Sequence, residues 1–534
     1  MADNFPTYRR LCAMLIGAAT AAVSVTAQPL PQRPQLVVGI VVEGLSNDYL
    51  ELLRSHFGQN GFRRLADKGV AISDIDFGTT LDGAASTALL FTGASPAVNG
   101  IGAATVYNRD DRRPHPALED PETIGNFTTE TLSPKALGAS TIADELRIAS
   151  GGLGYVYSIA PDPAQAIIMA GHAGNSAFWI NDLTGKWATT TFYRDLPQKP
   201  QEINHRTPLE YRLDTLQWVP SMAIDRYPDL PSYKKSYPFR HTFPRGDKNR
   251  FRAYKASAAA NTDVASMAVG YLNSMSLGKR EGADMLALAF SLNPYPYARD
   301  ADSRPELMDS YLRLDRDLGR IFDAIDAAGP GMDKTLVFVT GTPLTRRQRR
   351  DDEKWAIPYG EFSSRKAVSL LNMYLMAIHG NGEWVSGYHD SQLFLNHKLI
   401  KDRGKDLEEI RTAAARFLER MSGVSHAWTI DEVLSRQASE RPEAFRRNTV
   451  PETAGDVFIA IAPGWQEIDD DSDTEAPRTV TRAVASTAPA FILAPQAAPR
   501  RIDVPVDARV IAPTVCRLLR IRSPNGSALP PLRL

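Results

Sequence analysis

A continuous apolar run near the start of the chain constrains the fold more than any other feature. Residues 36–42 read LVVGIVV and contain no polar side chain. Runs rich in β-branched residues are typical of strands that are buried on both faces of a parallel sheet. Further strands are predicted, in chain order, at residues 71–77, 155–159, 285–290, 335–340, 456–461 and 490–493.

Helical patterns alternate with these predicted strands. Helices are expected at residues 49–68, 84–92, 303–325 and 407–421. In the third of these, Ser303 and Glu306 have the spacing of a capping box, and Gly329 with Pro330 ends the pattern. The alternation predicts an α/β fold with a mainly parallel sheet flanked by helices.

The composition is that of a globular protein with enough apolar material for a large core. The 534 residues are 43% hydrophobic and 23% charged, which excludes a disordered chain, a coiled coil and a polytopic membrane protein. A net charge of −1 gives no reason to expect a nucleic-acid partner. The two cysteines, Cys12 and Cys516, exclude a disulfide framework, and Cys516 is interpreted as a small buried hydrophobe.

The first 27 residues have the pattern of a secretory signal. Arg9 and Arg10 precede a 15-residue apolar stretch, residues 11–25, which is shorter than the roughly 20 residues that span a bilayer. Val25 and Ala27 supply small side chains for signal-peptidase cleavage. We therefore expect an exported bacterial protein, periplasmic or secreted, with no transmembrane span after cleavage. An uncut N-terminal anchor is the alternative.

Two stretches interrupt the strand–helix rhythm of a single domain over residues 28–534. Residues of about 180–250 and 344–450 are predicted to be cap-like insertions. The basic residues 346–350 are followed by acidic residues 351–353, so a solvated loop is expected there. The acidic run 469–475 is interpreted in the same way. Aromatic side chains in and beside the first insertion are favoured as packing residues over a sugar- or protein-contact surface; they include Trp179, Trp187 and Trp218.

Several segments, in order from about residue 33 to residue 528, carry a family resemblance. They include GIVVEGLSNDYL after residue 38, LLFTGASPAVNGI at 89–101, GASTIADELRIAS at 138–150 and AGHAGNSAFWIND at 170–182. The chain resembles the alkaline phosphatase superfamily, above all the monomeric bacterial alkaline phosphatases related to nucleotide pyrophosphatase/phosphodiesterases. The resemblance implies a cleft at the carboxyl ends of the strands, where two zinc ions hold a phosphate while a Thr or Ser attacks phosphorus.

The chain departs from this family pattern at the positions that contact the substrate. The nucleophile position falls on Gly83, which has no side chain. The phosphate-binding Asn falls on Ala104, and the Lys and Arg contacts fall on Pro161 and Pro163. A slip of three residues in the loop would instead bring Thr80 to the nucleophile position, which is the less favoured alignment.

The zinc ligands implied by the resemblance are reduced to one carboxylate. The Asp that ends the first strand is replaced by Glu43, which is longer by a methylene group. Other ligand positions fall on Pro294, Ala298, Thr342 and Pro343, and no histidine follows His426. Catalytic zinc needs at least three protein ligands, so neither a metal site nor a cofactor is expected here.

These departures favour an exported, catalytically inactive pseudoenzyme that acts by binding or assembly, with an unknown protein or glycan partner. The alternative is an active phosphomonoesterase or phosphodiesterase with a non-standard metal site, supported by the fold and by Glu43. A third hypothesis keeps the cleft as a metal-free ligand site. His172 is interpreted as a packed side chain rather than a ligand.

Overall fold

The computed structural model describes residues 33–299, 302–343, 360–435, 443–469, 478–479 and 486–534. The predicted signal peptide, the basic loop at 346–350 and acidic residues 470–475 lie outside the described residues. Within the described part of the chain, no helix has both the length and the apolar character needed to cross a membrane. The division into one domain with two insertions stays a prediction.

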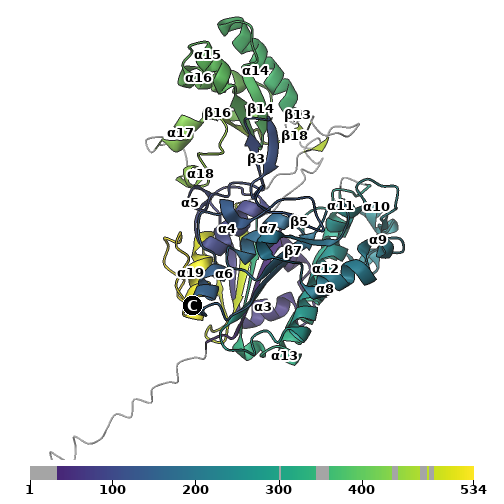
Figure 1. Ribbon diagram of the computed structural model, residues 1–534. Coiled ribbons are helices and arrows are strands. Elements are labelled where there is room, and N and C mark those ends of the chain that lie inside the picture. The colour runs from purple at the N-terminus through teal and green to yellow at the C-terminus, as the bar shows by residue number, and fades with distance from the viewer. Residues whose placement is uncertain (1–32, 300–301, 344–359, 436–442, 470–477, 480–485) are drawn as a thin grey trace, which may run out of the picture. The chain divides into compact units, whose positions relative to one another are not determined.

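Within the described residues, a sheet of eleven strands forms the centre of the fold (Figure 1), in the order β21-β2-β20-β12-β1-β11-β6-β7-β8-β5, with β22 beside β2. β1 lies between β11 and β12 and is parallel to both. The strands are β1 Leu36–Glu43, β2 Val70–Asp76, β5 Gly125–Asn126, β6 Val156–Ala160, β7 Ser176–Ile180, β8 Trp187–Thr190, β11 Asp284–Ser291, β12 Thr335–Gly341, β20 Thr487–Leu493, β21 Arg500–Ile502 and β22 Val506–Asp507. The predicted α/β class is confirmed. β20 runs antiparallel to both of its neighbours, β2 and β12.

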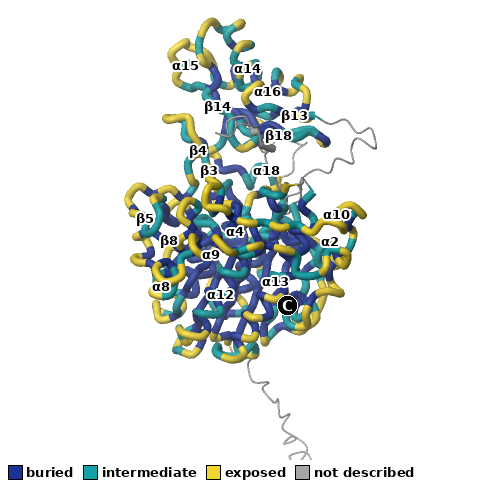
Figure 2. Tube along the Cα trace, turned by 90° about the vertical axis from the view of Figure 1, so that its right-hand side faces the viewer, coloured by how far each residue is buried: buried dark blue, intermediate teal, exposed yellow. Residues whose placement is uncertain are grey.

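Helices cover both faces of this sheet. The side chains of β1 alternate between the two faces and belong to a different hydrophobic cluster on each. Val37 and Val41 belong to one cluster, and Val38 and Ile40 belong to the other. The first cluster includes α4 Gly83–Thr92, α6 Ile142–Ala149, α7 Pro163–Ala170 and α19 Ile511–Leu519. The second includes α3 Phe62–Lys68, α11 Arg250–Lys255, α12 Ala258–Ser274 and α13 Arg304–Ala327. Figure 2 shows the sheet as the buried interior between these helices.

The predicted helix at 49–68 forms as two pieces instead of one. α2 Asn47–Leu52 ends well before α3 begins. Asp315, on α13, accepts hydrogen bonds from the backbone N–H of Gly58 at 2.7 Å and of Phe62 at 2.8 Å. A carboxylate from a distant helix therefore satisfies the first backbone donor of α3 and one donor of the segment before it, both of which a single continuous helix would have used internally.

The predicted capping box at the start of α13 does not form. Ser303 occupies the N-cap position, but its side chain makes no capping hydrogen bond. The carboxylate of Glu306 lies 2.9 Å from Nε2 of His241 instead. Pairing with a histidine from a distant part of the chain replaces the local bond that the sequence pattern favoured.

The predicted strand at 456–461 forms, but it pairs outside the central sheet. β17 Val457–Ile461 belongs to a four-stranded antiparallel sheet with β14 Val385–His389, β15 Gln392–Leu395 and β16 Val424–Thr429. This sheet packs with α14 Ser364–His379 and α16 Leu407–Leu418 around a hydrophobic cluster of its own. Buried Asp456 ties the hairpin of β3 Thr105–Asn108 and β4 Arg113–Pro116 to this sheet through Arg109 at 2.9 Å.

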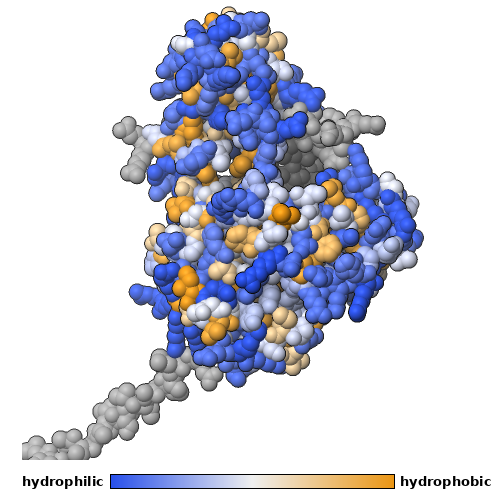
Figure 3. All heavy atoms as spheres, in the orientation of Figure 1, coloured by the Kyte–Doolittle hydropathy of each residue, from blue (hydrophilic) through white to orange (hydrophobic). Residues whose placement is uncertain are grey.

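Shorter elements complete the described chain. The strands are β9 Gln217–Trp218, β10 His241–Thr242, β13 Gly360–Ser363, β18 Trp465–Asp469 and β19 Arg478–Thr479. The helices are α5 Pro96–Asn99, α8 Gln198–Arg206, α9 Leu209–Arg212, α10 Ser232–Ser236, α15 His397–Asp402, α17 Ile430–Leu434 and α18 Glu443–Arg447. Trp179, Trp187 and Trp218 are 0, 5 and 2% exposed, so all three are packing residues. On the face in Figure 3, apolar side chains are scattered in small groups among hydrophilic ones.

Candidate functional site

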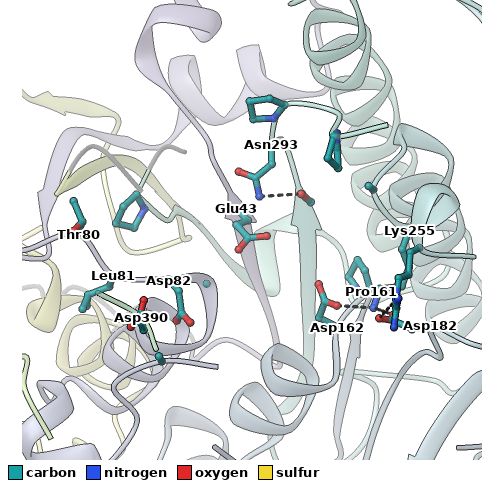
Figure 4. A pocket seen from close by; sticks show the side chains of 18 of the residues that line it. Glu43, Thr80, Leu81, Asp82, Pro161, Asp162, Asp182, Lys255, Asn293 and Asp390 are labelled. Atoms are coloured by element: carbon teal, nitrogen blue, oxygen red, sulfur yellow. Dashed lines mark hydrogen bonds and ion pairs between the residues drawn. The ribbon is translucent and has the colours of Figure 1, made fainter. Parts of the chain in front are cut away.

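A cleft of about 550 Å³ opens at the carboxyl end of the central sheet (Figure 4). Glu43 ends β1, Asp82 precedes α4, and Asp162 follows β6. Asp390 reaches the same cleft from the turn between β14 and β15. Parallel strands bring such residues together because their carboxyl ends meet at one edge of the sheet. The cleft therefore lies where the family resemblance places an active site.

Gly83 and Glu43 are packed against each other in this cleft. A Cβ atom added to Gly83 would lie 2.2 Å from Oε1 of Glu43 and 3.0 Å from its Cδ. The first separation is too short for non-bonded atoms, and the second is tight. The carboxyl group of Glu43 thus fills the space in which a side chain at the nucleophile position would begin, and the extra methylene group of Glu relative to Asp gives it that reach.

Asp82 fixes the start of α4 and also reaches the predicted phosphate-contact position. Its carboxylate accepts hydrogen bonds from the backbone N–H of Ala85 at 2.8 Å and of Ala104 at 2.6 Å. The surrounding protein removes water from the carboxylate and raises the pKa of Asp82 to about 6, although these hydrogen bonds lower it. Ala104 therefore contributes a backbone donor that is already engaged by the protein.

Glu43 is protonated at neutral pH. Loss of water around the carboxyl group, together with the charges of Asp162 and Asp82, raises the pKa of Glu43 to about 8. A hydrogen bond from Asn293 and the charge of Lys255 act in the opposite direction without balancing these effects. Glu43 is consequently a neutral hydrogen-bonding group in the cleft at pH 7.

Lys255, from the end of α11, supplies positive charge on one side of the cleft. Its Nζ lies 2.6 Å from Asp162 and also contacts Asp182, and the side chain is only 10% exposed. Burial opposes the charge, but the two carboxylates outweigh it and hold the pKa of Lys255 above its ordinary value. Lys255 could not be predicted from the sequence, because it belongs to no motif and lies far along the chain from Asp162.

The remaining predicted positions fall at different depths around the cleft. Pro294 and Pro343 line it, as does Pro161. Thr342 is 1% exposed, and its hydroxyl has no hydrogen-bond partner among the described residues. Ala298 packs against an aromatic cluster that contains Trp218 and Tyr295.

His172 and Cys516 both lie outside the cleft. The side chain of His172 is 40% exposed, and its Nδ1 lies 3.2 Å from Asp144, which raises the pKa of the histidine. Burial raises the pKa of the Cys516 thiol, so Cys516 is the small buried hydrophobe that was predicted.

Thr80, the alternative nucleophile, lines the cleft, whereas Thr79 accepts a hydrogen bond from Asn448 at 2.7 Å.

The donors in this cleft do not fit the shell of two zinc ions that the family resemblance implies. Among the residues that the structure describes, no three His, Cys, Asp or Glu side chains are placed to hold a metal ion. Two of the carboxylates, Asp162 and Asp182, are paired with Lys255.

We predict that Glu43→Gln flattens the pH dependence of stability. Because the folded-state pKa of about 8 lies above the ordinary value of 4.5, the contribution of Glu43 to stability is fully present below pH 4.5 and is lost as the pH rises through 8. The wild-type free energy of unfolding should fall over this window by up to about 1.4 kcal/mol per pH unit more steeply than that of the variant. Urea unfolding at pH 5, 6, 7 and 8 measures both; parallel curves would contradict the prediction.

Similar proteins include bacterial enzymes that match nearly the whole chain. Alkaline phosphatase PhoV of Synechococcus elongatus is 26% identical, with 93% of this chain and 92% of the relative covered. Alkaline phosphatase PafA of Elizabethkingia meningoseptica is 24% identical, with 94% of each covered. The crystal structure of wild-type PafA superposes with a TM-score of 0.80, covering 94% of this chain and 98% of that one at 24% identity. That superposition establishes the fold.

These relatives contradict the prediction that no cofactor is expected. PhoV and PafA are alkaline phosphatases, and they match this chain over nearly their full length. The resemblance to such enzymes itself implies zinc. The prediction was wrong because it inferred the absence of a cofactor from the residue types at aligned positions alone. The metal content of the purified protein is therefore to be measured.

A family model covers most of the chain. It describes type I phosphodiesterase / nucleotide pyrophosphatase and matches residues 37–486. The match begins in β1, whose last residue is Glu43, and extends past β17, so it includes the strands that place the cleft. The chain therefore belongs to the type I phosphodiesterase / nucleotide pyrophosphatase family of hydrolases, with the fold of the alkaline phosphatase superfamily.

Proposed function

We propose that this protein is an exported member of its family that binds a ligand in the cleft and does not hydrolyse phosphate esters. One observation carries the proposal: the nucleophile position is Gly83, and the space for a side chain there is filled by the carboxyl group of Glu43. Phosphoryl transfer through a covalent intermediate needs a nucleophilic side chain at that point. The proposal does not depend on whether the protein binds a metal ion. Export rests on the signal-like pattern of residues 1–27.

The charge of the cleft also disfavours a phosphate ester. The positive charge of Lys255 is already engaged by Asp162 and Asp182. Asp82 and Asp390 add carboxyl groups to the same walls. A phosphate dianion would therefore meet carboxylates where transition-state stabilisation requires positive charge or hydrogen-bond donors.

The second candidate is an active phosphomonoesterase or phosphodiesterase. It is favoured by the similarity to alkaline phosphatases PhoV and PafA. In this alternative Thr80, whose side chain lines the cleft, would take the place of the missing nucleophile.

Turnover by the mature protein separates the two candidates. Protein purified from the periplasmic fraction, with Gln28 as its expected first residue, is assayed with p-nitrophenyl phosphate and bis(p-nitrophenyl) phosphate. Assays contain added zinc or a chelator. We expect no rate above that of a mock preparation in either condition. Zinc-dependent release of p-nitrophenol that Thr80→Ala abolishes would overturn the proposal and establish the second candidate.

A further inference from the structure

The stretch of chain around α10 carries positive charge without any acidic residue. Residues 230–246 contain two lysines and two arginines but no Asp or Glu, although the whole chain has 61 basic and 62 acidic residues. The stretch includes α10 and β10, and α10 lies at the margin of the fold in Figures 1 and 2. None of its residues lines the cleft. Its charge therefore belongs to a surface outside the candidate functional site.

The aromatic side chains of this stretch divide into an inward pair and an outward pair. Phe243 is 1% exposed, and Phe239 packs edge-on against Trp218. Tyr233 and Tyr237 are instead 61 and 82% exposed. Because the two phenylalanines anchor the stretch to the core, the two tyrosine rings are held at the surface by packed chain. Core packing therefore accounts for the phenylalanines and leaves the tyrosines without a structural role.

Three basic side chains beside these tyrosines are exposed and unpaired. The side chains of Lys235, in α10, and Arg240, just before β10, have no ion-pair or hydrogen-bond partner among the described residues. The same holds for the side chain of Arg226, which ends the short helix η4 Ile224–Arg226 in contact with α10. Arg245 differs, since it pairs with Asp214. The three free cations can therefore pair with groups outside the chain.

We propose that this surface binds an acidic polysaccharide, whose carboxylates pair with the cations and whose sugar rings stack on the tyrosines. We call it the α10 surface; it consists of Arg226, Tyr233, Lys235, Tyr237 and Arg240. Unpaired positive charge favours an anionic partner. A tyrosine offers an apolar ring face beside a hydroxyl group, which suits a sugar ring. A polymer also gains affinity by contacting several spaced groups at once. The inference goes beyond the proposed function and shares with it only the expectation of export.

Two other anionic partners are disfavoured. Contact with a membrane interface needs large apolar side chains that can enter the boundary of the acyl chains. The two phenylalanines of the stretch, Phe239 and Phe243, pack inward instead. A nucleic acid is disfavoured by the net charge of −1, which gives no long-range attraction, and by export, which would separate the protein from it.

Biolayer interferometry on the immobilised mature protein tests the proposal. The probe is polygalacturonate, and its control is dextran of matched length, which carries no charge. We expect saturable binding of polygalacturonate and none of dextran. The binding should be weaker at about 300 mM than at about 20 mM NaCl, because salt screens exposed charges.

Surface variants assign the binding to these side chains. Lys235→Gln combined with Arg240→Gln should weaken the binding of polygalacturonate about tenfold, since two exposed ion pairs are lost. Tyr237→Ala should weaken it about threefold with the same salt dependence, since it removes a ring but no charge. The matched control is Lys398→Gln combined with Lys401→Gln, on exposed positions of α15. It changes the net charge equally and should leave the affinity unchanged.

Four outcomes would overturn the inference. Two are absence of polygalacturonate binding by the folded protein and an equal loss of affinity in the control variant. The third is equally tight binding of poly-L-aspartate that Tyr237→Ala does not weaken, because the surface would then accept any polyanion. The fourth is binding of phosphatidylglycerol vesicles in place of the polysaccharide, which would assign the surface to a membrane. Turnover of phosphate esters would overturn the proposed function alone, since no side chain of the α10 surface lines the cleft.

Discussion

Replacing Gly83 by threonine should destabilise the protein by about 1–3 kcal/mol, the usual cost of forcing extra atoms into a packed site. The first added atom would lie 2.2 Å from the Glu43 carboxyl, so the glutamate must leave its position. Equilibrium urea unfolding at pH 6, where Glu43 is protonated, measures the change in the free energy of unfolding.

The matched background is Glu43→Asp, which withdraws the carboxyl group by one methylene. In that background Gly83→Thr should cost less than about 1 kcal/mol, so the double-mutant cycle should show a coupling energy of about 1–2 kcal/mol. Additive effects would mean that the two residues do not share the space. In that case the loss of the nucleophile would have no structural connection to the exchange of Asp for Glu.

Replacing Lys255 by methionine should destabilise the protein by about 2–4 kcal/mol. The substitution keeps the length of the side chain but removes a charge that two carboxylates share, Asp162 and Asp182. The side chains of Asp162 and Asp182 are 51 and 41% exposed, so water recovers part of their solvation and the loss stays below that of a fully buried pair. Thermal and urea unfolding of the variant measure it.

Variants that neutralise one of the two partner carboxylates serve as the comparison for Lys255→Met. Asp162→Asn and Asp182→Asn each leave Lys255 with one carboxylate, so each should cost less than the removal of the lysine. A variant Lys255→Met as stable as the wild type would show that the ion pairs contribute nothing net. Stability restored to Lys255→Met by added Asp182→Asn would support the assigned cause, because it removes one of the stranded charges.

Six strands of the central sheet could be predicted from the sequence, because each is a local apolar run; they are β1, β2, β6, β11, β12 and β20. The other strands of the sheet, β5, β7, β8, β21 and β22, were not predicted. The run at 36–42 became β1, and its alternation between the two clusters follows from the two-residue period of a strand. The break between α2 and α3 could not be predicted, since it depends on Asp315 from a helix some 250 residues away. Pairing across such distances leaves no local pattern.

Part of the cleft could also be predicted from the sequence. Glu43 and Gly83 were located because both lie at fixed distances from recognisable segments. Lys255 and Asp390 were not, because one ends a short helix in an irregular stretch and the other lies in a turn of the separate antiparallel sheet. The contact between Glu43 and Gly83 could not be predicted, although both departures from the family pattern could be identified in the sequence. Only the structure shows that Glu43 fills the space left by the missing side chain at Gly83.

The antiparallel strand β20 has a consequence for how the chain is made. β2 joins the central sheet through β20, which is synthesised roughly 400 residues later. At about 5–20 residues per second, the nascent chain carries β2 without this partner for tens of seconds. An unpaired strand edge is a template for association with other chains. A chain that stops before residue 487 would keep that edge permanently, so truncated products of this protein should accumulate as aggregates and not as folded fragments.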